Sequence, residues 1–168
     1  MDRLYIETKF AADDAGAIAA LAWPFGGKGD RIGDMIMPGA FAKAKFPLPI
    51  LFAHDQRSPI GVWTEGEEKA SGFYLKGRLL VDDVALAREV RALIKADAVK
   101  GVSIGFRSLK WDRRADGGRE IKDLELLEAS IVAIPMHPGA RVTSAKTAVQ
   151  AYALAAALNR ATAHLAKG

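Results

Sequence analysis

Two long strand-like segments joined by a tight turn place the strongest constraint on the fold. Residues 101–111 and 119–135 have the apolar and β-branched content of strands, and Asp116-Gly117-Gly118 lies between them. An Asp-Gly pair between two such segments is a strong signal for a tight reversal of the chain. The sequence therefore predicts two long antiparallel strands over these residues.

Shorter strands are predicted upstream of this pair. Apolar or alternating segments bounded by Gly, Pro and Asp residues occur at 3–10, 17–24, 48–54, 60–66 and 72–81. The last two are expected to form a hairpin around the charged segment from Glu65 to Lys69. Residues 38–45 are expected to form one or two helical turns.

Two helices are also predicted. Asp82 or Asp83 is expected to cap the first helix, which ends near residues 96–98. Its apolar residues at helical spacing are Leu86, Val90, Leu93 and Ile94. The second helix is alanine-rich and lies near the C-terminus, with one apolar face made of Leu154, Leu158, Ala161 and Leu165.

Together these elements predict an α+β fold that is mainly β. We expect a small antiparallel β-barrel or a strongly bent sheet, with the helix over residues 83–96 and the C-terminal helix packed outside. Residues 1–144 are expected to form the main domain, and residues 145–168 a helical tail. A chain of 168 residues is long enough to bury one substantial core.

Composition narrows the classes of function. The chain has no cysteine, which excludes a disulfide framework, a thiolate metal site and a cysteine nucleophile. Its net charge of +4 is mild, and its basic residues are scattered except at Lys110, Arg113 and Arg114, so we expect no nucleic-acid partner. The sequence has no apolar run of membrane-spanning length and no secretory signal at its N-terminus, so we expect a cytoplasmic protein without a membrane partner.

Ser103 is the candidate nucleophile. In a strand over residues 101–106, alternation places Ser103 on one face between Gly101 and Gly105. Glycine weakens a strand, so two glycines beside a serine suggest open space over its hydroxyl for a substrate. The structural alternative is a face of small residues packed under a helix. The Gly-x-Ser-x-Gly pattern also occurs in the nucleophile elbow of α/β-hydrolases, but strand-like residues after Gly105 do not fit that turn.

His54 and Glu128 are candidates to activate this serine. His54 ends an apolar strand, where a histidine is either a core-edge residue bonded to backbone or a base for a serine hydroxyl. Glu128 interrupts the apolar face formed by the even positions of residues 119–135, with Glu125 on the opposite face. A buried carboxylate needs a partner, which is either an imidazole N–H or an arginine such as Arg107 or Arg78.

His137 is an alternative third member, in a Ser-His-His arrangement, because its proline-flanked loop directly follows the strand that carries Glu128. His164 is expected to be only a helix residue. The His, Asp and Glu residues do not show metal-ligand spacing, and the glycine-rich stretch at residues 26–29 is not framed as phosphate binding requires. We therefore expect neither a metal nor a cofactor.

Four short motifs in this order resemble the prohead protease family of HK97-type phages, whose fold is similar to that of herpesvirus assemblin. The motifs are GDMIMPGAF at 33–41, LFAHD at 51–55 followed by Pro59-Ile60-Gly61, GVSIGF at 101–106 and LEASIVAIP at 127–135. The resemblance spans about residues 3–144. It implies that His54 is the base, Ser103 the nucleophile and Glu128 the acidic third member.

The resemblance also implies a function. Such a serine endopeptidase cleaves the scaffolding segment of the major capsid protein, and commonly itself, inside the assembling procapsid in the host cytoplasm. Backbone N–H groups of residues 138–142 are a candidate oxyanion hole. Two other functions stay open: a non-catalytic capsid-assembly module with the same fold, and a hydrolase of small esters.

Overall fold

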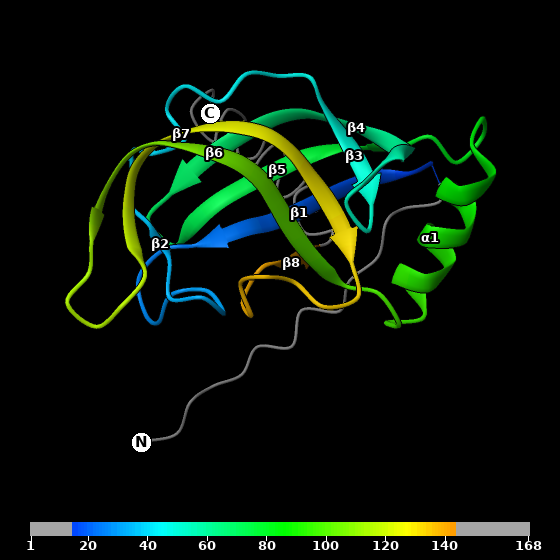
Figure 1. Ribbon diagram of the computed structural model, residues 1–168. Coiled ribbons are helices and arrows are strands. Elements are labelled where there is room, and N and C mark those ends of the chain that lie inside the picture. Colours follow the sequence, from blue (N-terminus) through cyan, green and yellow to red (C-terminus); the bar gives the residue numbers. More distant parts are fainter. Residues whose placement is uncertain (1–14, 144–168) are drawn as a thin grey trace, which may run out of the picture.

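A computed structural model of the chain describes residues 15–143 (Figure 1). The predicted strand at 3–10 and the predicted tail at 145–168 lie outside the described residues. The described part contains helix α1 (Ala85–Lys95) and the strands β1 (Ala17–Pro24), β2 (Met35–Ile36), β3 (Leu48–Phe52), β4 (Asp55–Lys69), β5 (Gly72–Leu79), β6 (Gly101–Arg113), β7 (Arg119–Val132) and β8 (Arg141–Thr143). Within residues 15–143, no helix is long and apolar enough to cross a membrane.

Seven of the strands close into a barrel. The strand order is β2-β7-β3-β4-β5-β1-β8-β6, and pairing of β6 with β7 completes the ring. In Figure 1, β6 and β7 bend together across one side of the barrel, and α1 lies at the opposite end from the turn that joins them. The prediction of a mainly β, α+β fold with a small barrel is confirmed.

The sequence had suggested an antiparallel barrel, but the sheet also contains parallel strand pairs. The β3 strand runs parallel to β7, with Ile50 opposite Ala129 and Phe52 opposite Ile131. The short β2 strand is also parallel to β7. Turn residues reveal which consecutive strands form hairpins, whereas these parallel pairs join segments far apart in the sequence and leave no local signal.

The predicted turn at residues 65–69 is strand, and the predicted helical turns at residues 38–45 do not form a helix. The β4 and β5 strands stay paired as far as Lys69 opposite Gly72, beyond the predicted turn at residues 65–69. Cross-strand and same-strand ion pairs accommodate the charged residues, including Lys76 with Glu65 at 3.1 Å. The predicted helical turns at residues 38–45 are a series of tight turns, with Ala40 N–H donating to the Met37 carbonyl at 3.1 Å.

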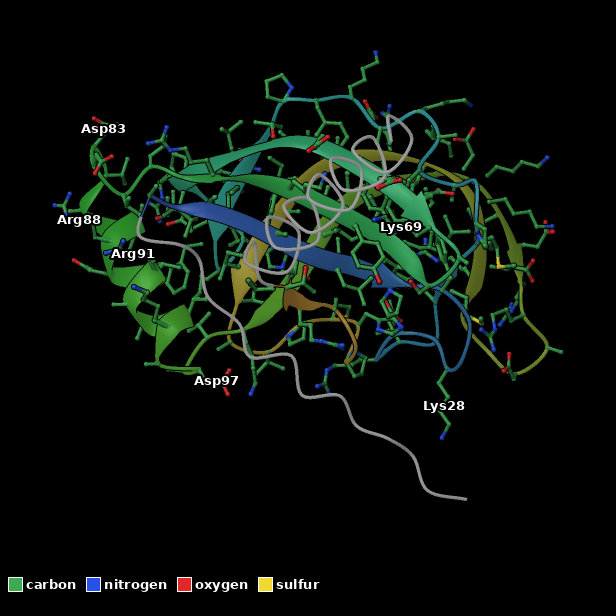
Figure 2. All side chains as sticks on the ribbon, turned by 180° about the vertical axis from the view of Figure 1, so that it is seen from behind. Lys28, Lys69, Asp83, Arg88, Arg91 and Asp97 are labelled. Atoms are coloured by element: carbon green, nitrogen blue, oxygen red, sulfur yellow. The ribbon has the colours of Figure 1, made fainter. Side chains whose placement is uncertain are left out.

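The α1 helix forms where predicted but without the predicted cap. Val84 is the N-cap residue, and its side chain makes no capping bond. The chain enters the helix through a backbone turn in which Val84 N–H donates to the Leu80 carbonyl at 2.8 Å. Figure 2 shows Asp83 and Asp97 at opposite ends of this helix. Its buried residues are Ala87, Val90 and Ile94, whereas Leu93 is exposed.

The β7 strand contains an extra residue that reverses its alternation. Gly105 on β6 pairs with Glu128, and the next residue, Phe106, pairs with Leu126. Leu127 is therefore unpaired, as the additional residue in a β-bulge, and its side chain is exposed.

This bulge corrects the predicted faces of the strand. Core side chains before and after the bulge are Leu124, Leu126, Ala129 and Ile131. Glu128 and Ser130 consequently point away from the core side that Leu124 and Leu126 occupy. Glu125 shares the non-core side with Glu128, because their β6 partners, Arg107 and Gly105, are two residues apart. Ile134, predicted on the apolar face, is exposed.

Trp63 connects two strands of the barrel, β4 and β7, that do not pair with each other. Its side chain on β4 is fully buried, and its indole N–H donates to the Ala129 carbonyl of β7 at 2.9 Å. It packs in a core that includes Ile50, Ile60, Phe73, Leu75, Val102 and Ile131.

Replacing Trp63 with phenylalanine should lower the free energy of unfolding by about 2 to 4 kcal/mol. The change leaves a cavity and removes the donor from a buried carbonyl. Urea unfolding followed by circular dichroism measures the loss. The exposed Trp111 provides the control, because Trp111→Phe should cost less than about 1 kcal/mol. Equal losses for the two variants would contradict this role of Trp63.

Candidate active site

A cleft of about 520 Å³ crosses the non-core side of β6. Ser103 and His54 both line it, although they lie 49 positions apart in the sequence. The other lining residues are Asp30, Ile32, Asp34, Ile104, Gly105, Phe106, Ser108, Trp111, Arg119 and Met136. The cleft therefore combines two of the predicted site residues with a mixed apolar and charged wall.

Ser103 is positioned by the alternation of β6. Val102 is fully buried in the core, and Ile104 packs against the core from the same side of the strand. Ser103 faces the other side, opposite Ser130 of β7, and is 5% exposed.

The glycines that flank Ser103 had been expected to leave open space, but other side chains occupy the positions next to them. A Cβ at Gly101 would lie 2.7 Å from Pro135 Cδ. A Cβ at Gly105 would overlap the Glu128 carboxylate and lie 3.0 Å from its Cδ. Neighbouring side chains therefore fill both positions, and the strand pattern alone could not reveal this because both neighbours belong to later segments of the chain.

His54 lies in the two-residue turn between β3 and β4. Phe52 pairs with Asp55 across this turn, and Ala53 and His54 have positive φ values of 55° and 61°. The left-handed conformation costs a non-glycine residue about 1 to 2 kcal/mol. A backbone bond from Ala53 N–H to the Ile131 carbonyl at 3.0 Å holds the turn against β7. Strain of this kind is often retained where it orients a functional side chain.

Glu128 receives two hydrogen bonds. Its Oε1 lies 2.8 Å from His54 Nδ1, and its Oε2 accepts a bond of 2.6 Å from the Ser130 hydroxyl. Its side chain is 15% exposed. The arginines proposed as alternative partners bind elsewhere: Arg107 pairs with Glu125, and Arg78 pairs with Asp82.

When Glu128 is ionised, its contact selects one tautomer of the His54 ring. An ionised carboxylate can only accept a hydrogen bond, so Nδ1 of His54 is the donor and carries a proton. The Nε2 atom of the neutral ring then keeps its lone pair. Within residues 15–143, His54 and Ser103 are not hydrogen-bonded to each other, although both line the cleft. Catalytic bonds are often long in a free enzyme and tighten when substrate binds.

His137 is buried against Trp23. The residue is 8% exposed, and its ring packs edge-on against Trp23 with 4.7 Å between centroids. Its Nδ1 accepts a bond of 3.1 Å from Gly139 N–H. Burial lowers the pKa of His137 below its ordinary value of 6.5. Burial thus favours the neutral form of His137, which shares a small secondary pocket with Ser103.

The far wall of the cleft was not predicted from the sequence. Asp34 is 2% exposed and accepts a bond of 2.9 Å from the Arg119 backbone N–H, and the Arg119 guanidinium closes on the same carboxylate. This ion pair raises the pKa of Arg119, chiefly through the hydrogen bond to Asp34. The Arg119 guanidinium also lies 5.8 Å from the Trp111 ring centroid. The only sequence signal was Asp34 itself, which follows Gly33 in the first motif.

Three of the four backbone N–H groups at residues 138–142 are not available for the predicted oxyanion hole. The N–H of Gly139 donates to the His137 ring, and that of Ala140 donates to the His137 carbonyl at 3.0 Å. Val142 N–H donates to the Lys100 carbonyl at 2.9 Å. These donors are already used inside the fold, and Pro138 has none. Among the described residues, no cluster of three or more His, Asp or Glu side chains could hold a metal ion.

Several phage proteins are similar to this chain in sequence. The chain is 34% identical over 127 residues to the prohead protease of Escherichia phage T5, a match that covers 70% of the chain and 58% of the relative. It is 30% identical over 125 residues to the prohead protease of Enterobacteria phage HK97, covering 70% and 55%. A capsid polyprotein of Pseudomonas phage PAJU2 is 31% identical over 124 residues, which are 18% of its length.

The chain thus spans little more than half the length of the two prohead proteases that it matches. A family model described as caudovirus prohead serine protease matches residues 5–154, which include all the described strands and the cleft. Because this match covers most of the sequence, the chain belongs to the caudovirus prohead serine protease family.

Proposed function

We propose that the protein is a serine endopeptidase in which Ser103 is the nucleophile, His54 the general base and Glu128 the residue that orients His54. The observation that carries this proposal is the bond of 2.8 Å between His54 Nδ1 and Glu128 Oε1, beside a cleft shared by His54 and Ser103. Membership of a serine protease family supports the reaction class.

The proposed reaction is acyl transfer through Ser103. His54 Nε2 takes the hydroxyl proton as Ser103 Oγ attacks the peptide carbonyl, and the protonated ring then gives that proton to the leaving amine. Water resolves the acyl-enzyme by the same route. Glu128 keeps the proton on Nδ1, so that Nε2 is the basic nitrogen, and its charge stabilises the imidazolium that forms.

The proposed substrate is the scaffolding segment of the major capsid protein, together with the protease itself. The names of the relatives, prohead protease and capsid polyprotein, support a substrate that belongs to the capsid. The proposed place of action is the assembling procapsid in the cytoplasm of the host. We propose residues 1–144 as the protease domain and residues 145–168 as a separate tail.

Two other functions are distinguished by simple tests. A non-catalytic assembly module would bind the capsid protein but leave a fluorophosphonate probe unreacted, whereas the proposed enzyme is labelled at Ser103. A hydrolase of small esters would turn over nitrophenyl esters without cutting the capsid protein. The full chain should be tested together with the major capsid protein of its own virus, because the isolated chain can be inactive.

Replacing Ser103 with alanine should lower cleavage of the co-expressed capsid protein by about 10⁴- to 10⁶-fold without unfolding the protein. His54→Ala should produce a similar loss, because the two groups act as a unit. The double variant should therefore be scarcely worse than either single one. Intact mass spectrometry of the capsid protein measures cleavage, and near-normal cleavage by a folded Ser103→Ala protein would refute the assignment.

Glu128→Gln and His137→Gln should separate the two candidates for the third residue. The first keeps the side-chain shape but removes the charge next to His54, so activity should fall, by less than for Ser103→Ala. His137→Gln should keep most of the activity, since His137 binds Gly139 and packs on Trp23. A fully active Glu128→Gln protein with an inactive but folded His137→Gln protein would assign the role to His137.

His137 should also contribute a pH-dependent term to stability. The pKa of His137 is lower in the folded protein, so only the unfolded chain takes up this proton as the pH falls below about 6.5. The free energy of unfolding should therefore decrease on acidification, from about pH 7.5 to about pH 5.5, by more in wild type than in His137→Gln. Urea unfolding at both pH values measures this difference, and identical decreases would contradict it.

A further inference from the structure

Ser130 is a polar residue that the proposed reaction does not use. It lies on β7 and is fully buried, at 0% exposure. Its register partners are Ser103 on β6 and Leu51 on β3, so strands flank it on both edges. Its hydroxyl donates a bond of 2.6 Å to Glu128 Oε2. This bond joins a buried group to the oxygen of Glu128 that does not contact His54.

Ser130 is not an alternative nucleophile. Ser103 and Ser130 face each other across β6 and β7, but only Ser103 lines the cleft. The Ser130 hydroxyl proton is already donated to Glu128. A substrate carbonyl in the cleft would therefore meet Ser103, and the chemistry open to Ser130 is to hold the carboxylate.

Gly105 completes the surroundings of this carboxylate. It pairs directly with Glu128 across the two strands. Any side chain at Gly105 would overlap Glu128 Oε1, the same oxygen that contacts His54. The missing Cβ therefore lets the carboxylate lie across β6, between Ser130 and His54.

This arrangement restricts a side chain that is otherwise free to rotate. A glutamate has several rotamers, and ordering one costs up to about 2 kcal/mol. The Ser130 hydroxyl fixes Oε2, and the Gly105 gap accommodates Oε1, so that Oε1 faces His54 Nδ1. The hydroxyl also stabilises negative charge on a carboxylate that is only 15% exposed.

We propose that Ser130 and Gly105 are positioning residues that hold the Glu128 carboxylate on His54 Nδ1. They act through Glu128 and do not touch the substrate. The second glycine of the Gly-x-Ser-x-Gly stretch accordingly provides room for the carboxylate and not for the substrate. This inference rests on the proposed function for its catalytic effect, but the positioning itself is a property of the free protein.

The tautomer of His54 is the direct measurement of positioning. In full-length protein labelled with ¹⁵N-histidine, nitrogen shifts report which ring nitrogen carries the proton, and His54→Gln identifies the signal. Wild type should hold the proton on Nδ1. Ser130→Ala and Gly105→Ala should each give a mixture of the two tautomers, whereas Ser130→Thr, which keeps a hydroxyl, should restore the Nδ1 form.

Activity gives the second readout. Ser130→Ala and Gly105→Ala should lower kcat for cleavage by about tenfold to a hundredfold, with KM nearly unchanged. This is the range seen when a hydrogen-bond partner that orients a metal-binding side chain is removed. Gly77→Ala is the matched control for strand damage. It is a glycine on β5 whose Cβ would overlap the Val62 carbonyl oxygen, and β5 does not contribute to the cleft. Gly77→Ala should lower stability but leave the His54 tautomer unchanged.

The outcomes separate the two proposals. A pure Nδ1 tautomer in folded Ser130→Ala and Gly105→Ala proteins overturns the positioning role, whether or not the protein is a peptidase. A tautomer shift in Gly77→Ala equal to that in Gly105→Ala also overturns it, because general strand damage would then be the cause. A tautomer shift confined to Ser130→Ala and Gly105→Ala supports the role even if Ser103→Ala refutes the peptidase.

Discussion

Pairing along both edges of β7 is the interaction on which the barrel and the cleft depend. One edge is bonded to β6 over most of its length, and the other to β3 and β2. The first edge brings Ser103 beside Ser130 and Glu128, and the second brings the end of β3, and hence His54, to the same strand. The same strand pairings therefore close the sheet and bring the candidate site residues together.

The bulge at Leu127 changes which residues of β7 point into the core and which point toward the candidate site. Without an extra residue, a side chain two or four positions after Leu126 would point into the core. With it, Ala129 and Ile131 fill the core while Glu128 and Ser130 face the cleft side. A part-buried carboxylate is tolerable there because each of its oxygens has a donor.

The sequence predicted the elements that carry local signals. Turn residues located the β6–β7 hairpin, helical spacing located α1, and alternation placed Ser103 on the side away from Val102. Glu128 was selected by reasoning that missed the bulge, since an extra residue in a strand has no fixed composition. The parallel pairing of β3 and the Asp34–Arg119 wall also escaped prediction, because both join segments far apart in the chain. The roles of the site residues remain predictions.

The left-handed turn at Ala53 and His54 limits which sequences can carry this base. Both residues occupy a backbone conformation that asparagine, aspartate and glycine accept readily and that β-branched residues resist. The side chain at position 53 has no role in the proposed chemistry. Valine, isoleucine or threonine there would nevertheless disfavour the left-handed backbone and so displace the His54 side chain. Backbone sterics thus set which residues are tolerated at position 53. In a library of variants at this position, many substitutions would be lost because they impair folding, whatever their effect on catalysis.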